Sequence, residues 1–374
     1  MPLIEVDQST HAFIAGLPKA ELHVHIEGTL TPARRWQLAL KNGIEQAYPD
    51  VAALVASMNF DAPDASIYLQ KFLAAYYEGI KVLRSAEDFR DLTLDYLERC
   101  RAEQVVYAEL SFDPQAHTSR GVALGAVMEG LAEGRRIGRE KLGVQTNLIL
   151  CINRDRPIES AFVALTEARE FRDQIVGFGL DSDELNNPPI KFRKLYDAAR
   201  SQGYRLTAHC DVDQPATRQN IRQCLDILKV ERIDHGINTI EDPALIDTAR
   251  ARGITFTTCP TWRKIDKAPR RVDRIRVMHD RGLKITLNTD DPGLFASGTM
   301  GNMLPAVMVA GGFTEVEMGQ FMINAFEGAW IDNDLRGVFV RQVQEYLAAY
   351  RPGGVQPAWS KNLSEPIFGL TPLI

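Results

Sequence analysis

The stretch RLTAHCDVDQPATRQNIRQCLDILKVERIDH, residues 205–235, places a helical segment between two short runs that favour β-strands. Within 221–229, leucine and isoleucine recur at steps of three and four residues, which is the spacing of an amphipathic helix. Strand, helix and strand in this order form the unit that builds a parallel sheet. Both candidate strands end in a histidine, His209 and His235, so the same unit carries chemistry as well as structure.

The same alternation continues along the chain, for example into the helical spacing of residues 191–201. Eight strands with helices between them predict an α/β fold, a closed (β/α)8 barrel formed by residues 1–374 as a single domain. An open doubly wound sheet is the alternative, but no G-x-G-x-x-G or G-x-x-x-x-G-K turn follows a strand. The candidate strands are 21–26, 105–112, 146–151, 175–180, 205–209, 232–235, 254–258 and 284–288.

Two segments extend beyond a minimal barrel. Residues 51–83, between the first two strands, have helical character and are predicted to cap the barrel mouth as a lid. Residues 352–374 are rich in proline and glycine and are predicted to form a tail.

Composition narrows the class of protein. The net charge of -6 provides no basic field that would attract nucleic acid. Five cysteines, odd in number and without a C-x-x-C pair, argue against a disulfide framework or a cysteine-built zinc site. The N-terminus lacks a basic region followed by an apolar run, and no stretch approaches the roughly 20 apolar residues that span a bilayer. We therefore expect a cytoplasmic protein without a nucleic-acid or membrane partner.

Histidines and aspartates collect at the predicted strand ends. His23 and His25 are two residues apart on a strand, so their side chains point the same way. His209, His235 and Asp290 end three further strands, and in a barrel these ends meet at the face that carries active sites. Imidazoles with one carboxylate and an open position suit catalytic zinc, although iron, manganese or cobalt accept similar ligands.

Such a metal lowers the pKa of a bound water from about 15.7 to about 7, which yields a hydroxide nucleophile at neutral pH. Attack on an aromatic carbon also requires a proton to leave the water and another to reach a ring nitrogen. His235 is placed to accept the first proton, and Asp291 is placed to hold the water and a donor on the ring. The alternative for the N-T-D-D-P stretch, 288–292, is a turn with a solvated acidic pair.

Together, these motifs resemble the adenosine and adenine deaminase family of the amidohydrolase superfamily, over a span from about residue 17 to about residue 326. The resemblance implies one zinc ion per chain, held by His23, His25, His209 and Asp290. It also implies that His235 is the water-orienting base and that Asp291 contacts the purine ring. The motifs are LPKAELHVHIEGTL at 17–30, HC at 209–210, IDHG at 233–236, CP at 259–260 and NTDDP at 288–292.

The segment GFGLDSDELNNPPIKF, 177–192, is more similar to the adenine deaminase branch than to the nucleoside branch. In that family, this strand end faces the base. The resemblance therefore implies substrate contacts from Gly179, Ser182 and Glu184.

One departure from the family concerns the general acid. The family usually has H-A-G-E after the fifth strand, and its glutamate protonates the ring nitrogen. This chain has H-C-D-V-D, which places Val212 three residues after His209. The acid is then Asp213 or Asp211, and we favour Asp213 because about two extra residues in the loop would carry its shorter side chain forward.

A second departure follows the seventh strand, in CPTWRKIDKAPRR at 259–271, where the family more often has a Ser-Asn pair. Trp262 is placed to stack on a flat ring, and Arg263 or Lys264 to meet an anionic or oxo substituent. The alternative is a packed tryptophan beside a solvated basic loop.

The sequence thus predicts a zinc-dependent hydrolytic deaminase of purine metabolism that acts on a small molecule, adenine or adenosine. Other amino-heterocycles, such as N6-substituted, 8-oxo or pterin-like compounds, remain alternatives, as does a catalytically impaired purine-binding barrel. Homo-oligomerisation is left open. A base-flipping deaminase is disfavoured because the H-x-E at 25–27 has no P-C-x-x-C partner.

Overall fold

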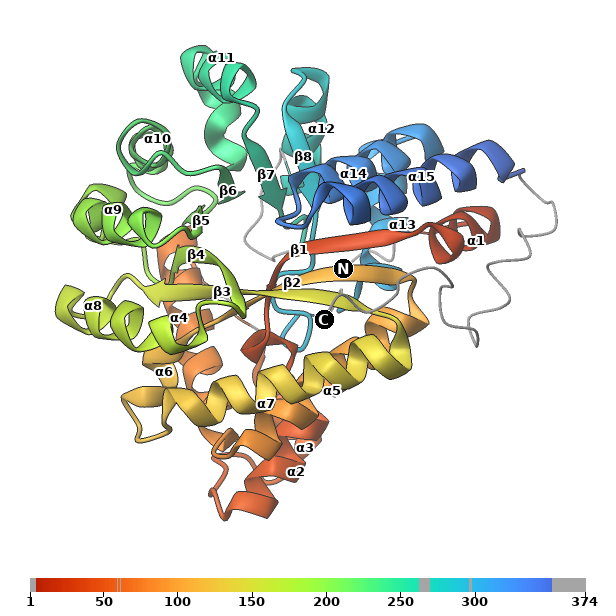
Figure 1. The fold of residues 1–374 in the computed structure, drawn as a ribbon. Coiled ribbons are helices and arrows are strands. Elements are labelled where there is room, and N and C mark those ends of the chain that lie inside the picture. The colour runs from red at the N-terminus through yellow and green to blue at the C-terminus, as the bar shows by residue number, and fades with distance from the viewer. Residues whose placement is uncertain (1–4, 59, 61, 262–269, 296–297, 352–374) are drawn as a thin grey trace.

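The computed structural model describes residues 5–58, 60, 62–261, 270–295 and 298–351. Eight strands pair in parallel in their sequence order, as predicted (Figure 1). They are β1 Lys19–His25, β2 Val105–Phe112, β3 Gln145–Asn153, β4 Ile175–Asp181, β5 Arg205–Cys210, β6 Arg232–His235, β7 Thr255–Thr258 and β8 Lys284–Leu287.

The barrel closes between β8 and β1, just past the end of β8. The backbone N–H of Asp290 donates to the carbonyl of His23 at 3.1 Å, and the N–H of His25 donates to the carbonyl of Asp290 at 3.0 Å. Closer to the strand itself, the Asn288 side chain accepts the N–H of Leu22 at 2.8 Å. The closure therefore fixes Asp290 directly beside both histidines of the H-V-H motif.

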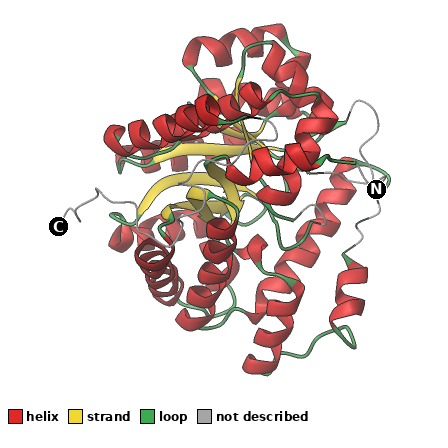
Figure 2. Cartoon of the chain, turned by 90° about the vertical axis from the view of Figure 1, so that its right-hand side faces the viewer, coloured by secondary structure: helices red, strands yellow, loops and turns green. Residues whose placement is uncertain are grey.

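Helices surround the strands, so that the sheet lies in the interior (Figure 2). This arrangement is the (β/α)8 barrel that the alternation of segments predicts. The helices are α1 Gln8–Gly16, α2 Pro32–Asn42, α3 Val51–Ser57, α4 Ala65–Gly79, α5 Ala86–Ala102, α6 Pro114–Thr118, α7 Leu124–Ile137, α8 Ile158–Glu167, α9 Arg193–Ser201, α10 Thr217–Gln223, α11 Pro243–Arg252, α12 Arg271–Asp280, α13 Met300–Gly311, α14 Glu315–Gly328 and α15 Asn333–Ala349.

Local sequence signals set many of these boundaries, and α11 is an example. The Asp242 side chain accepts the N–H of Ala244, and Pro243 occupies the first turn, where no N–H is needed. The helix ends at Gly253, whose φ of 64° is the left-handed conformation that glycine adopts without strain.

The amino end of the barrel is closed by a buried ion pair. Arg232 Nη2 donates to Glu109 Oε2 at 2.6 Å, and the Arg232 guanidinium lies 3.8 Å from the centre of the Trp330 ring. The hydroxyl of Tyr107 and the backbone N–H of Trp330 donate to the other oxygen of Glu109. Because both oxygens and the charge are matched, the pair is accommodated in the interior.

The predicted lid is helical and consists mainly of α3 and α4. Two hydrogen bonds join the start of α4 to the loop after β5: Gln214 Nε2 donates to the carbonyl of Ala65 at 3.1 Å, and Ser66 Oγ donates to Gln214 Oε1 at 3.0 Å. Further along α4, Phe72 stacks on Phe295 with ring centres 5.2 Å apart. The predicted tail, 352–374, lies outside the described residues. Among the described helices, none is long and apolar enough to cross a bilayer.

Candidate active site

The structure brings together the four residues that were predicted as metal ligands, His23, His25, His209 and Asp290. Their ligand atoms all lie within 4.8 Å of one another, and all four residues are buried. The Nε2 atoms of His25 and His209 are 3.2 Å apart, and Asp290 Oδ1 lies 3.2 Å from His23 Nε2 and 3.6 Å from His25 Nε2. Three ring nitrogens and one carboxylate oxygen thus face a common centre.

The chemistry of this donor set fits a metal ion. His23 Nε2 is buried and has no hydrogen-bond partner within the described part of the chain. An imidazole nitrogen in that situation loses its hydration without replacement, unless a cation fills the centre that it faces. Three imidazoles and a carboxylate suit zinc.

The second nitrogens of His23 and His209 lie against backbone carbonyl oxygens. Such contacts set the ring orientation and the tautomer of a ligating histidine. They therefore direct Nε2, and not Nδ1, at the shared centre. The contacts of Nδ1 are Thr257 O at 3.0 Å for His23 and Leu180 O at 3.0 Å for His209. The nearest carboxylate oxygen to Nδ1 of His25, Asp181 Oδ2, is 3.7 Å away, beyond hydrogen-bond distance.

Left-handed backbone turns aim several side chains into the site. Ser182, His235 and Asp290, which end or follow β4, β6 and β8, have φ values of 68°, 60° and 67°. A non-glycine residue in this conformation costs roughly 1–3 kcal/mol and persists where the surrounding structure enforces it. These turns mark the carboxyl end of the barrel as a site under functional constraint.

A pocket lies between the barrel mouth and α4 and is lined by three of the four proposed ligands; its empty space, open solvent included, is about 400 Å³. The barrel supplies its polar wall and α4 its apolar and aromatic wall. The lining residues are His25, Leu69, Phe72, Leu73, Tyr76, Tyr77, Asp113, Asp181, Ser182, His209, Asp211, His235, Asp290 and Asp291.

His235, predicted as the base, lies beside the ligands. Its Nε2 is 3.2 Å from Asp211 Oδ1 and 3.8 Å from Asp290 Oδ2. Burial lowers the pKa of His235 well below its usual value, since the ring lies among other histidines in the interior. The ring is therefore neutral at physiological pH and can accept a proton.

The structure places Asp213, which was favoured as the acid, outside the pocket over the metal ligands. Its carboxylate accepts hydrogen bonds from Arg274 at 2.6 Å and Asn238 at 2.8 Å, and 46% of its side chain is exposed. Asp213 lines a separate surface depression. A φ of 60° turns the chain outward at this residue. Asp211, the alternative, lines the pocket over the metal ligands.

Asp291 sits where a substrate contact was predicted. It lines the pocket, and its Oδ1 is buried without a hydrogen-bond partner among the described residues. A Cβ on Gly28 would lie 1.8 Å from that oxygen, so the carboxyl group needs a glycine there. Burial and the adjacent charge of Asp290 raise the pKa of Asp291 well above its usual value, which keeps a proton available for donation.

Of the other predicted substrate contacts, Ser182 lines the pocket, and its Oγ accepts a hydrogen bond from the Tyr77 hydroxyl at 2.9 Å. Gly179 is not among the lining residues. It lies within the barrel wall, where a Cβ would come within 2.7 Å of Cys151 Sγ. Trp262, Arg263 and Lys264 lie outside the described residues.

Glu184 does not line the pocket either, because its carboxylate is held behind the loop after β5. It accepts hydrogen bonds from the backbone N–H of Asp211 and from Asn220 Nδ2, the latter at 2.9 Å. Arg154 Nη1 lies 3.7 Å away. Glu184 therefore supports the backbone of Asp211 rather than facing a ligand.

Asp113 and Asp181 also line the pocket, although neither was among the predicted metal-binding, catalytic or substrate-contacting residues. Asp113 follows the end of β2, and Asp181 ends β4. Burial raises the pKa of each carboxyl group, and each has one oxygen without a hydrogen-bond partner in the described structure. Their place at strand ends was the signal that would have identified both.

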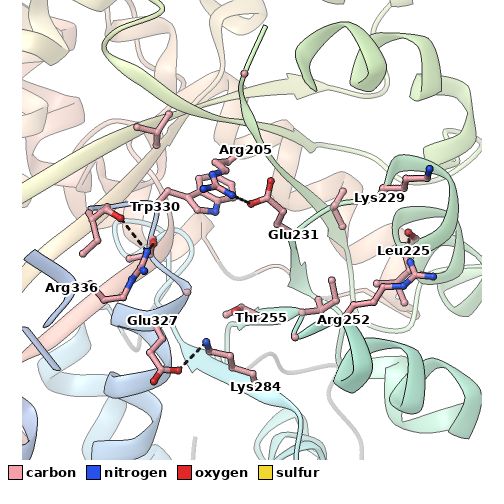
Figure 3. Close-up of a pocket in the computed structure, with 18 of the residues that line it drawn as sticks. Arg205, Leu225, Lys229, Glu231, Arg252, Thr255, Lys284, Glu327, Trp330 and Arg336 are labelled. Atoms are coloured by element: carbon pink, nitrogen blue, oxygen red, sulfur yellow. Dashed lines mark hydrogen bonds and ion pairs between the residues drawn. The ribbon is translucent and has the colours of Figure 1, made fainter. Parts of the chain in front are cut away.

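A larger depression opens at the opposite end of the barrel, and several of its charged side chains form ion pairs with one another (Figure 3). Arg205 pairs with Glu231 at 2.9 Å, and Lys284 pairs with Glu327 at 3.0 Å. The depression lies at the amino ends of β5, β7 and β8, far from the face where barrel enzymes carry their chemistry. The smaller pocket under α4 is therefore the candidate active site.

Comparisons with known proteins identify the family of the chain. The sequence model of the adenosine deaminase family matches residues 18–346. The adenine deaminase of Streptomyces coelicolor is 42% identical over 337 residues, 88% of this chain and 96% of that protein.

Two solved structures share the fold. The adenine deaminase of Arthrobacter aurescens superposes with a TM-score of 0.83 at 37% identity, over 89% of this chain and 100% of that one. An amidohydrolase from Burkholderia ambifaria with bound Zn has a TM-score of 0.81 at 28% identity, over 93% and 97% of the two chains.

Proposed function

Because the chain belongs to the adenosine deaminase family and is an aminopurine deaminase, we propose that it hydrolyses the free base adenine with one zinc ion per chain. The observation that carries the proposal is the cluster of His23, His25, His209 and Asp290 at the floor of the pocket under α4. We also propose that the protein is cytoplasmic, because its five cysteines are free, as is usual in a reducing compartment.

The pocket favours a neutral base over a nucleotide. Carboxyl groups from four strand ends surround it, namely Asp113, Asp181, Asp211, Asp290 and Asp291. A phosphate group would be repelled by those that are ionised, whereas the N–H groups of a free base find acceptors there. On the other side, Leu69, Phe72 and Leu73 of α4 offer an apolar surface to a flat ring.

Zinc is proposed on the donor set and on the similar amidohydrolase from Burkholderia ambifaria, which was solved with bound Zn. His23, His25, His209 and Asp290 would hold the ion. When bound, it would supply an activated water at the floor of the pocket.

The residues around that floor have distinct roles in this proposal. His235 orients the water and takes its proton as the oxygen attacks C6 of adenine. Asp211, 3.2 Å from His235, gives a proton to ring nitrogen N1 so that electrons can leave the π system. Asp291 donates a hydrogen bond to N7. As the adduct collapses, the C6–N6 bond breaks: His235 gives its proton to the departing amino group, the hydroxyl proton passes to Asp211, and ammonia leaves a carbonyl oxygen on C6.

The test is amine release by the zinc-loaded protein from adenine, adenosine, AMP, N6-methyladenine, 8-oxoadenine and an aminopterin, measured as methylamine for N6-methyladenine and as ammonia for the others. We expect adenine to have the highest kcat/KM and AMP to be inactive. A preference for adenosine would contradict the free-base proposal, and zinc-bound protein that binds adenine without releasing ammonia would identify a binding protein instead.

A further inference from the structure

A buried pair of side chains lies beneath the proposed metal ligands, on two neighbouring strands. Asp234 belongs to β6 and Thr257 to β7, and the two residues are 4% and 0% exposed. Neither residue lines the pocket under α4. Any effect of these two residues on the site must therefore act through the proposed metal ligands and not through contact with the substrate.

Asp234 touches one ligand histidine directly. Its Oδ2 lies 3.3 Å from Nδ1 of His209, on the side of the ring that faces away from the common centre. The carbonyl oxygen of Leu180 lies 3.0 Å from the same nitrogen. A neutral imidazole has a single N–H, so two acceptors at Nδ1 place the hydrogen there and leave Nε2 free to bind a metal.

Thr257 joins this contact to a second ligand. Its hydroxyl donates to the other oxygen of Asp234 at 2.7 Å, while its carbonyl oxygen lies 3.0 Å from Nδ1 of His23. The hydroxyl oxygen is also 3.3 Å from that nitrogen. A continuous chain of contacts therefore runs from His209 through Asp234 and Thr257 to His23.

We propose that Asp234 is a positioning residue that holds His209 in its metal-binding tautomer, and that Thr257 connects Asp234 to the second ligand, His23. The pair sets the affinity and geometry of the metal site and does not contact the substrate. The inference rests on the proposed function, because it takes His23 and His209 as ligands.

The substitution Asp234→Asn tests this proposal most directly. It keeps the size of the side chain, but it removes the charge and can offer only one acceptor oxygen. If that oxygen keeps the Thr257 hydroxyl, the amide N–H2 group faces the N–H of His209, donor against donor. If the amide turns round, the Thr257 hydroxyl loses its acceptor. The amide N–H2 group can then donate to that hydroxyl, so the contact is kept with reversed polarity; in either orientation the negative charge beside His209 is lost.

The experiment measures the Kd for Zn²⁺ by competition with a chelator, and the visible absorption spectrum of Co²⁺-loaded protein, which reports ligand geometry. We expect Asp234→Asn to raise the Kd about 10- to 100-fold and to alter the Co²⁺ spectrum. Thr257→Val keeps the backbone carbonyl and removes only the hydroxyl, so it should raise the Kd by less.

Glu109→Gln is the matched control. Glu109 is also a buried carboxylate on a barrel strand, but it pairs with Arg232 at the amino end, next to Trp330 of the depression in Figure 3. We expect this variant to unfold at a lower denaturant concentration and to keep the wild-type Kd for Zn²⁺.

Wild-type Kd and spectrum in folded Asp234→Asn would overturn the inference while leaving the proposed function intact. If that variant does not fold, an unchanged Kd in Thr257→Val overturns it in the same way. A Kd that rises equally in Glu109→Gln also overturns it, because the effect would then be general loss of rigidity. Wild-type protein without Zn²⁺ affinity would refute the inference and the proposed metal site together.

Discussion

Replacing Asp211 with asparagine tests the assignment of the general acid, and Asp213→Asn is its internal control. Asp211 Oδ1 lies 3.2 Å from His235 Nε2 and lines the pocket, whereas Asp213 is bound to Arg274 on the surface. Each substitution changes one oxygen to an amide nitrogen in the same loop. Any difference in activity between the two variants therefore reflects the position of the carboxylate and not the kind of substitution.

The expected magnitudes are well separated. A positioned general acid contributes about 10²- to 10⁴-fold in rate, which is about 2.7–5.4 kcal/mol of barrier. An exposed ion pair such as that of Asp213 contributes about 0–1 kcal/mol to stability and nothing to the chemical step. We expect kcat for adenine to fall at least about 100-fold in Asp211→Asn and to stay within about twofold of wild type in Asp213→Asn.

Steady-state ammonia release from adenine measures kcat, and elemental analysis of the same samples measures bound zinc. Zinc content should equal that of wild type in both variants, since neither residue is among the proposed ligands. Asp211→Asn protein with more than about a tenth of wild-type kcat would refute the reasoning. A large loss in Asp213→Asn with zinc retained would return the role to that residue.

Three further predictions follow from single contacts. In Gly28→Ala the new Cβ would lie 1.8 Å from Asp291 Oδ1, so kcat/KM for adenine should fall at least about tenfold with zinc retained; unchanged kinetics would contradict this. Gln214→Ala removes both hydrogen bonds to the start of α4, so backbone amides of α4 should exchange hydrogen faster, and unaltered exchange rates would show that the lid is held elsewhere. Burial, followed by the charge of Asp211, raises the pKa of Glu184 from 4.5 to about 7. The folded state then binds the extra proton, so the free energy of unfolding should fall as pH rises from about 4.5 to about 7. Denaturant titrations should show that the free energy of unfolding falls less with pH in Glu184→Gln than in wild type. An identical dependence on pH in the two proteins would contradict the prediction.

The barrel could be predicted because its strands are buried on both faces and therefore form continuous apolar runs. The bounds predicted for 105–112 and 232–235 coincide with those of β2 and β6, and the other strands differ by one or two residues at an end. Helix bounds were harder. The helix predicted at 221–229 is divided between the end of α10 and a π-helical turn, Cys224–Leu228.

The metal cluster could be predicted because strand ends of a barrel converge whatever the loops do. The general acid could not, because its position depends on the path of the loop after β5. That path is set by a left-handed turn at Asp213 and by Arg274, which is 61 residues further along the chain. A local sequence pattern contains neither piece of information.

Glu184 illustrates the same limit. The resemblance placed it toward a ligand, but the side chain turns back to the N–H of Asp211 and to Asn220. Strand periodicity fixes the direction of a side chain only up to the end of the strand. Beyond that point, hydrogen bonds to neighbouring loops decide which groups reach the pocket.

The most direct test of the central claim is turnover of adenine by one preparation in three states: as zinc-loaded protein, after removal of the metal by a chelator, and after addition of one equivalent of zinc. The account predicts ammonia release in the first state, loss of at least about 99% of it in the second and recovery in the third. Equal turnover by the metal-free protein, or no turnover of adenine with one zinc ion bound per chain, would contradict the account.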